Sequence, residues 1–250
     1  MYSSTILPAL CVGLAAAAPA MEQRQAGYAA TTTWEFTGNT LPTGLTASTW
    51  QVDADKPGLL NHRFDAENVV VQDGAMLLTV PGGQQGQQTI SSAEVATFSV
   101  LYGSVRVEAQ LTEVAGVVNG FFFYESDSQE QDIEFVTDPE SFSNKDSPSG
   151  GRELQYTNQA TQGQEDTMKY GSAPSDITSA IHEYGIDWSP GSTKYYLDGE
   201  LQYEFTTNVP TEPSAFLINN WVNGDPYWTL GPPKTDAVMK VTKITLAYNP

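Results

Sequence analysis

The chain has 250 residues, of which 40% are hydrophobic and 11% aromatic, so it is long enough to bury a full core in a single domain. Its 30 acidic residues stand against 11 basic ones, which gives a formal net charge of −19. Such a surface repels nucleic acid and anionic membranes, whereas a neutral polysaccharide is not repelled.

The N-terminus has the pattern of a secretory signal. An apolar run from Ile6 to Ala18 leads into Ala18-Pro19-Ala20, a small-x-small cleavage site. We therefore expect a signal peptide over 1–20, a short segment over 21–33 that is open to trimming, and one domain over 34–250. The only cysteine, Cys11, lies in the expected signal, so the secreted chain would hold no disulfide. We expect an extracellular or cell-wall protein that does not span a membrane.

Most of the remaining chain alternates between apolar and polar residues in short runs bounded by Gly, Pro, Asn and Asp, which predicts strands. The runs are Val69 to Val71, Ala75 to Val80, Tyr102 to Gln110, Val118 to Tyr124, Asp132 to Val136, Leu154 to Thr157, His182 to Trp188, Thr193 to Leu197, Leu201 to Phe205, Ala215 to Trp221 and Met239 to Tyr248. Eleven or more strands in one domain imply two packed sheets.

Turns and loops are marked by their own residues. Asp73-Gly74 and Asp198-Gly199 are signals for tight hairpins, since both residues tolerate a positive φ. The stretches Pro81 to Gln88 and Asp138 to Gly151 are predicted loops, and the only helical candidate is a short turn near Ser175 to Ala180.

The segment Glu130-Gln131-Asp132-Ile133-Glu134 carries the most information about function. On a strand, successive side chains alternate between faces, so the three acids share one face while Gln131 and Ile133 share the other. Carboxylates crowded in this way raise one another's pKa. A retaining glycosidase needs one ionised and one protonated carboxyl roughly 5 to 5.5 Å apart, which two Glu side chains on a curved strand can reach. The segment therefore predicts cleavage of glycosidic bonds.

This segment resembles the E-x-D-x-E strand of glycoside hydrolase family 16, the laminarinase and lichenase group. Further stretches occur in the order found in that family, and together they cover roughly Trp34 to Asn249: Asn61 to Val71, Gly74 to Val80, Tyr102 to Val107, Gly120 to Tyr124, His182 to Pro190, Tyr195 to Gly199 and Asn219 to Gly224.

The resemblance implies an all-β jelly-roll sandwich of two antiparallel sheets, similar to concanavalin A, whose concave sheet forms a cleft for β-glucan. It also implies that Glu130 is the nucleophile, Glu134 the general acid/base, and Asp132 an assisting residue. The single residue between Asp132 and Glu134 resembles the lichenase and transglycosylase branch, which lacks a bulge at that point.

By the same resemblance, Asn61, Glu94, Tyr156, Asn219 and Trp221 are expected to hold the sugar, since aromatic rings stack on pyranose faces while amides and carboxylates bind hydroxyls. Glu94-Val95-Ala96-Thr97 departs from the family's frequent Glu-x-Arg-Ser, because Ala96 replaces a guanidinium. Linkage specificity is therefore not fixed by the resemblance.

Other aromatic and titratable residues have ordinary structural interpretations. His182 is expected to be a hydrogen-bonded core or rim residue, and Trp34, Trp50 and Trp188 to fill the core, whereas Trp221 and Trp228 fit either the core or a subsite. We expect no cofactor and no metal site: the one other histidine is His62, and no cluster calls for the structural calcium that some family members hold.

Three functions remain open on the sequence. The first is a secreted retaining endo-β-glucanase that hydrolyses β-1,3 or mixed-linkage β-1,3/1,4-glucan and works as a monomer with the polysaccharide as its partner. The second is a cell-wall glucan transglycosylase of the same fold. The third is a non-catalytic glucan-binding lectin, which is disfavoured because both Glu130 and Glu134 are present.

Overall fold

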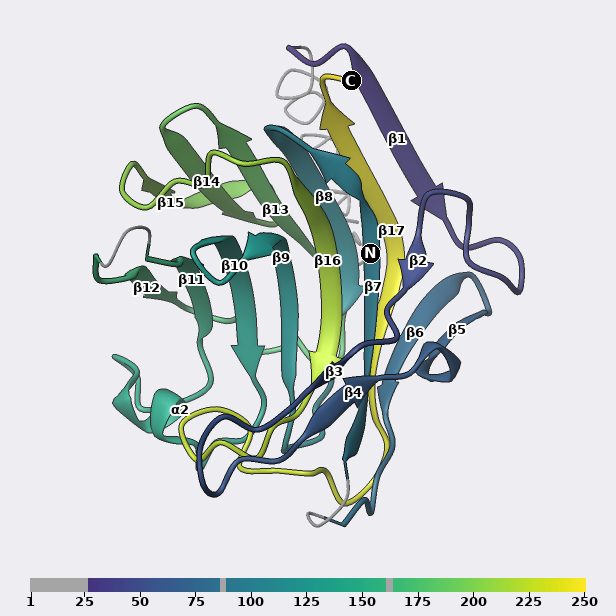
Figure 1. The fold of residues 1–250 in the computed structure, drawn as a ribbon, viewed down its shortest axis with the longest axis vertical. Coiled ribbons are helices and arrows are strands. Elements are labelled where there is room, and N and C mark those ends of the chain that lie inside the picture. Colours follow the sequence, from purple (N-terminus) through teal and green to yellow (C-terminus); the bar gives the residue numbers. More distant parts are fainter. Residues whose placement is uncertain (1–26, 86–88, 161–163) are drawn as a thin grey trace, which may run out of the picture.

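The computed structural model describes residues 27–85, 89–160 and 164–250. Two large sheets pack face to face in these residues, with the nine-stranded sheet in front in Figure 1 and the eight-stranded sheet behind it. Almost all strand pairs are antiparallel, and the exception is the parallel pair of β4 (His62–Phe64) with β7 (Ile90–Val100). The expected jelly-roll sandwich is confirmed.

The eight-stranded sheet contains β15 (Glu200–Phe205), β14 (Ser192–Leu197), β13 (His182–Ser189), β8 (Gly103–Gln110), β17 (Ala237–Tyr248), β6 (Ala75–Val80) and β5 (Val69–Gln72) in that spatial order, with β1 (Ala30–Glu35) paired to β17. The nine-stranded sheet contains β12 (Thr167–Gly171), β11 (Leu154–Asn158), β10 (Gln129–Val136), β9 (Val118–Ser126), β16 (Ser214–Trp221), β7, β4 and β3 (Gln51–Val52), with β2 (Thr46–Ala47) paired to β7.

All eleven predicted strands are present, but the described residues form six others that were not predicted, of which β7 is the longest. One reason lies in its composition, because small and polar side chains occupy both of its faces. Ser92 and Glu94 are buried on one face, whereas Ala93 and Val95 are buried on the other. The apolar alternation that marks a half-buried strand is therefore weak in this segment.

The predicted tight turns are present in the structure, whereas the predicted helical segment is not. Asp73 and Asp198 adopt φ values of 51° and 50°, and the glycine after each is also in the left-handed region, as a tight hairpin requires. Residues 175–180 form a turn only. A short helix, α2 (Phe142–Asp146), lies instead within the predicted loop 138–151, where the Ser141 side chain accepts a hydrogen bond from the Asn144 N–H as its N-cap.

The core lies between the two sheets. Phe121 and Phe123 of the nine-stranded sheet face Tyr184 and Trp188 of the eight-stranded sheet, and the rings of Phe121 and Tyr184 stack with their centroids 4.5 Å apart. Trp188 is fully buried and Trp34 is 3% exposed, which confirms the predicted core positions of both. Burial of each such ring stabilises the sandwich by about 1.5–3 kcal/mol.

The domain begins earlier than position 34. Ala30–Glu35 forms β1 along its whole length, with Ala30 paired to Tyr248, so residues 30–33 are part of the sheet and not a loose segment. The expected signal peptide 1–20 and Cys11 lie outside the described residues. Within the described part of the chain, no helix has the length and apolar character needed to cross a membrane.

Candidate active site

The three acids of the motif lie on one face of β10, as predicted. In the register with β9, Glu130 is opposite Tyr124, Asp132 opposite Phe122, and Glu134 opposite Gly120. The pairing is unbroken from Glu130 to Val136, and its only register shift lies between Gln129 and Glu130. The intervening Ile133 points into the core and is fully buried, so the acids face away from the core.

The Asp132 carboxyl is hydrogen-bonded to two side chains, those of Glu130 and Gln159. The residue is only 2% exposed, its carboxyl hydrogen-bonds that of Glu130, and Gln159 Nε2 donates to its Oδ2 at 2.9 Å. Burial and the charges of Glu130 and Glu134 raise the pKa of Asp132 well above its usual range. Asp132 is therefore the carboxyl that keeps its proton and donates it in a hydrogen bond to Glu130.

The other two acids also bind protons more tightly than usual. Burial is the main cause that raises the pKa of Glu130 to about 8, with the charges of Glu134, Asp127 and Glu94 adding to it, while the hydrogen bond with Asp132 acts in the opposite direction. Burial raises the pKa of Glu134 to about 7. No described residue hydrogen-bonds the Glu134 carboxyl, which leaves its proton available to a ligand.

Glu134 belongs to a row of side chains that crosses the nine-stranded sheet. Residues directly opposite one another on neighbouring strands share a face, and the registers link the row without interruption. Its members, from β12 to β7, are Tyr170, Gln155, Glu134, Gly120, Asn219 and Glu94. The row places an acid at the middle of the face, with polar groups on both sides.

Gly120 allows the Asn219 amide to lie next to the catalytic strand. A Cβ atom at position 120 would come within 2.5 Å of Asn219 Oδ1, a distance that real Cβ contacts do not reach. Asn219 Nδ2 in turn donates to Glu94 Oε2 at 3.5 Å, while Asn219 Oδ1 is buried without a partner among the described residues. The hydrogen-bonding capacity of this oxygen is therefore unused in this structure.

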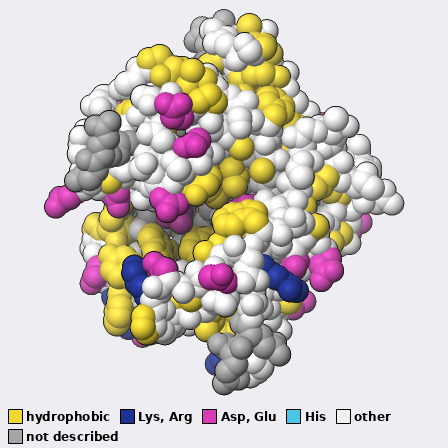
Figure 2. All heavy atoms as spheres, viewed as in Figure 1, with side chains coloured by type: hydrophobic (Ala, Val, Ile, Leu, Met, Phe, Trp, Pro, Cys, Tyr) yellow, Lys and Arg dark blue, Asp and Glu magenta, His cyan; other side chains and the backbone are white. Residues whose placement is uncertain are grey.

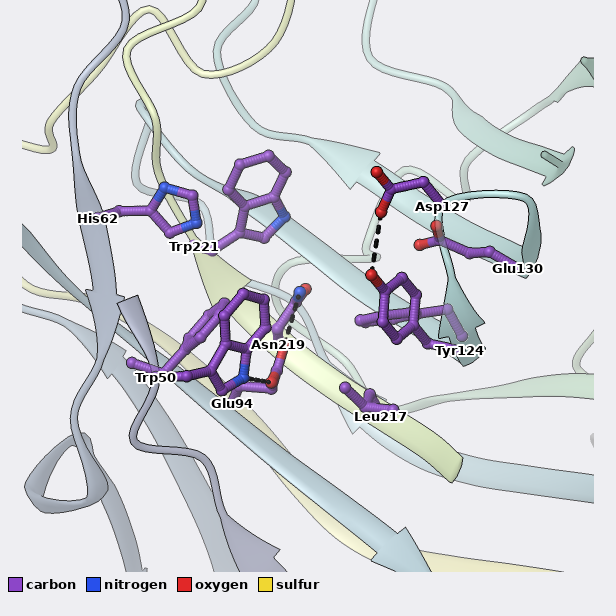
Figure 3. Close-up of a pocket in the computed structure, with 11 residues that line it drawn as sticks. Trp50, His62, Glu94, Tyr124, Asp127, Glu130, Leu217, Asn219 and Trp221 are labelled. Carbon is purple, nitrogen blue, oxygen red and sulfur yellow. Dashed lines mark hydrogen bonds between the residues drawn. The ribbon is translucent and has the colours of Figure 1, made fainter. Parts of the chain in front are cut away.

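A pocket of about 200 Å³ opens beside Glu130. Figure 2 shows hydrophobic and acidic side chains gathered around a hollow over β9 and β10. In Figure 3, Trp50, His62 and Trp221 lie on one side of the pocket, and Tyr124, Asp127 and Glu130 lie on the other. Its lining consists of Trp50, His62, Phe64, Glu94, Phe122, Tyr124, Asp127, Glu130, Leu217, Asn219 and Trp221. Aromatic rings with a few polar groups are the usual composition of a sugar or small-ligand site.

The structure brings together three of the five expected sugar-binding residues, since Glu94, Asn219 and Trp221 line the pocket. Tyr156 does not belong with them. It lies opposite Ile133 in the register, is fully buried in the core, and packs against Tyr195 and Tyr203. Its expected role in binding sugar directly is therefore wrong, and its neighbour Gln155 is the residue that faces the cleft.

Asn61 is also absent from the pocket lining. Its side chain is exposed, and its Oδ1 accepts a hydrogen bond from the Ala54 backbone N–H at 2.8 Å. The residue stabilises the loop before β4 in this structure, and its contact with sugar stays a prediction.

Trp50 was expected in the core but is 47% exposed and lines the pocket. Its Nε1 donates to Glu94 Oε1 at 3.1 Å. Burial raises the pKa of Glu94, although the hydrogen bonds from Trp50, Ser48 and Asn219 act in the opposite direction. Trp50 and Phe64 come from the edge of the sheet near β3 and β4. No periodic pattern marks these short strands, so they could not be predicted from the sequence.

The pocket also contains His62 and Tyr124, which the sequence did not assign. His62 is 6% exposed and packs beside Trp221 at 5.3 Å, and burial lowers its pKa to about 4, so it is neutral at neutral pH. Tyr124 hydrogen-bonds Asp127 in the β9–β10 turn. Tyr124 lies opposite Glu130 because of the register of the β9–β10 hairpin. This register could not be predicted from the sequence Ser126 to Gln129.

The remaining predictions concern residues away from the pocket. His182 lies on β13 in the other sheet, where Nδ1 is 2.7 Å from Asp198 Oδ2, which confirms a rim residue. Trp228 packs against Tyr227 and does not line the pocket.

Ala96 lies opposite Leu217 on the cleft face, so apolar atoms occupy that part of the cleft floor. Among the described residues, no group of three or more His, Cys, Asp or Glu side chains is arranged to hold a metal ion.

Comparison with known proteins agrees with this geometry. The family model for glycosyl hydrolases family 16 matches residues 59–239. A β-glucanase of Paenibacillus polymyxa is 29% identical over 183 residues, which cover 70% of this chain and 71% of that protein. A β-glucanase of Bacillus amyloliquefaciens is 31% identical over 125 residues, about half of either protein.

Solved structures share the fold. The β-glucanase of Bacillus licheniformis superposes with a TM-score of 0.66 at 23% identity, over 86% of this chain and 97% of the other. The catalytic domain of an endo-1,3-β-glucanase (laminarinase) from Thermotoga petrophila gives a TM-score of 0.68 at 16% identity, over 86% and 95%. The family model spans well over half of the sequence, and the chain therefore belongs to glycosyl hydrolases family 16 and is a glycoside hydrolase.

Proposed function

We propose that the protein is a retaining endo-β-glucanase that hydrolyses β-1,3 or mixed-linkage β-1,3/1,4-glucan. The observation that carries the proposal is the arrangement of three carboxyls on one strand face, where Asp132 is buried, Glu130 and Glu134 are half-buried, and Asp132 is hydrogen-bonded to Glu130. The β-glucanases among the relatives support the choice of substrate class.

The proposed mechanism assigns a separate task to each acid. Asp132 stabilises the ionised form of Glu130 by donating a hydrogen bond to it, and Glu130 attacks the anomeric carbon of the sugar. Burial raises the pKa of Glu130 to about 8 and that of Glu134 to about 7, so the reactive state is the one in which Glu130 has lost its proton while Glu134 keeps its own, and Glu134 then protonates the leaving oxygen. After the glycosyl–enzyme intermediate has formed, ionised Glu134 takes a proton from water, which then releases the sugar with its configuration retained.

Glu130→Gln and Glu134→Gln test these roles on barley β-glucan and laminarin. Each variant is expected to lose activity by a factor of about 10²–10⁴, the usual contribution of such a group. The control is Glu140→Gln, an exposed carboxylate that pairs only with Lys145, and it should keep wild-type activity. Near-normal rates in both catalytic variants would show that the assignment is wrong.

Product analysis separates hydrolysis from transfer, because a sugar acceptor can replace water in the second step of the same mechanism. Wild-type enzyme incubated with β-glucan and a labelled oligosaccharide should release free reducing ends and leave the label in the unmodified acceptor. Incorporation of the label into long chains would instead make the protein a transglycosylase. A lectin would do neither.

We further propose that the protein acts outside the cell, on the basis of the signal pattern over residues 1–20. N-terminal sequencing of protein recovered from the culture medium of an expressing host should begin at Met21 or a few residues later. Retention of the full N-terminus inside the cell would contradict the proposal.

A further inference from the structure

The pocket beside Glu130 is lined by three carboxyl groups, and burial raises the pKa of two of them, Glu94 and Glu130, which leaves the exposed Asp127 as the carboxylate that a cation would meet. Glu94, Asp127 and Glu130 line it, and no Lys or Arg does so in the described part of the chain. The one basic side chain there is His62, which is neutral above pH 4 or so because burial lowers its pKa. A bound cation would therefore meet attraction without competition from a protein charge.

Asp127 is the member of this set that the proposed mechanism does not use. It is exposed in the turn between β9 and β10, and its Oδ1 accepts a hydrogen bond from the Tyr124 hydroxyl at 2.9 Å. Tyr124 lies opposite Glu130 in the register, so this bond holds the Asp127 carboxylate beside the catalytic strand, as Figure 3 shows. Its charge contributes to the raised pKa of Glu130.

The pocket is also lined by a residue whose side-chain oxygen lacks a hydrogen-bond donor. Asn219 lines the pocket and is 7% exposed, and its Oδ1, which the surrounding atoms cover in this structure, has no partner among the described residues. A buried acceptor without a partner costs about 1–3 kcal/mol, so a ligand that donates to it is favoured. An ammonium group carries three donors and no acceptor, whereas a hydroxyl supplies one donor.

The walls of the pocket suit the same kind of group. The rings of Trp50, Phe64 and Trp221 line it, and aromatic faces attract ammonium groups, most strongly those of tryptophan. The pocket's volume of about 200 Å³ is small, which suits a single sugar unit more than a ligand of several rings.

We propose that this pocket binds a protonated amino sugar, so that β-linked glucosamine polymers of the chitosan class are ligands of the protein besides neutral glucans. The inference deepens the proposed function, since it names a further sugar class for the same cleft. It concerns binding alone and requires no change in the catalytic steps.

Calorimetric titration of the wild-type protein measures the preference directly. The two ligands are a glucosamine tetramer and its fully N-acetylated counterpart, which has the same backbone without the charges. At about pH 6 and low salt the amine is protonated, and the glucosamine tetramer should bind about tenfold more tightly, equivalent to about 1.4 kcal/mol. The preference should shrink as salt is added. Equal affinities, or no binding of the glucosamine tetramer, would overturn the proposal.

Two variants of the same hairpin locate the effect. Asp127→Asn should bring the ratio of the two dissociation constants to within about twofold of unity. Glu125→Gln removes the same charge two residues away from a side chain that does not line the pocket, so its ratio should match the wild type. Equal ratios in both variants would contradict the role of Asp127. Titration does not depend on turnover, so a protein that fails to hydrolyse β-glucan would refute the proposed function and leave this result readable.

Discussion

The contact between Gly120 and Asn219 gives the most specific prediction from the structure. In Gly120→Ala the new Cβ would lie 2.5 Å from Asn219 Oδ1, whereas its next contacts, at 3.5 and 3.6 Å with Asn219 Cγ and Phe122 Cδ1, are ordinary. The clash therefore falls on the end of one side chain. Only the Asn219 amide has to move, and the backbone of the sheet can stay in place.

The size of the effect follows from what the displaced amide does. Its movement displaces a residue that lines the pocket and breaks the 3.5 Å hydrogen bond to Glu94. A hydrogen bond is worth about 0.5–1.5 kcal/mol, so kcat/KM on barley β-glucan should fall about three- to tenfold. Thermal unfolding should change little, by about 1 kcal/mol or less, because a flexible side chain absorbs the contact.

A double-mutant cycle tests the reasoning. Asn219→Ala removes the atom that the new Cβ would meet, so Gly120→Ala should have almost no further effect in that background. Reducing-sugar assays of the two single variants and the double variant give the coupling, which should be about 1 kcal/mol. If Gly120→Ala lowers kcat/KM as much in the Asn219→Ala background as in the wild type, the displacement of Asn219 is not the cause.

Three further predictions concern single side chains. Trp50→Phe removes the donor to Glu94 Oε1, so KM for β-glucan should rise about three- to tenfold, and an unchanged KM would argue against this contact in binding. Tyr156→Phe removes a buried hydroxyl without a partner on the core face; KM should stay within about twofold and the melting temperature should not fall, whereas a large rise in KM would restore Tyr156 to the sugar site. Glu134→Gln should change the pH dependence of stability. The pKa of Glu134 in the folded state, about 7, lies above its usual value of 4.5, so its proton stabilises the fold most below about pH 4.5 and this stabilisation disappears as the pH rises through 7. The free energy of unfolding of the variant relative to wild type should therefore grow by at most about 3 kcal/mol from pH 4.5 to pH 8, and a constant difference would contradict the raised pKa.

The catalytic strand could be predicted from the sequence because its information is local. Acids at alternate positions with Ile133 between them already define two faces, whatever strands pair with β10. The hairpins at Asp73-Gly74 and Asp198-Gly199 were predictable for the same reason, since the turn residues themselves carry the positive φ.

The side walls of the pocket depend on register and could not be predicted in the same way. Tyr156 and Gln155 are adjacent, and only the pairing of β11 with β10 decides that Gln155 shares the face of Glu134 while Tyr156 shares that of Ile133. Trp50 is a comparable case. A large aromatic residue suits the core by composition, but Trp50 directly precedes β3, a strand of two residues at the sheet edge, and its ring lines the pocket instead.

The assignment of Glu130 as the nucleophile is tested most directly by trapping the covalent intermediate. An activated 2-deoxy-2-fluoro β-glucosyl oligosaccharide slows the second step of a retaining reaction, so the sugar stays attached to the enzyme. Peptide mapping by mass spectrometry should then find one added sugar chain on the peptide that contains Glu130, and fragmentation should place it on that carboxylate. A sugar attached to Glu134, or turnover of the reagent without any attachment, would contradict the proposed mechanism.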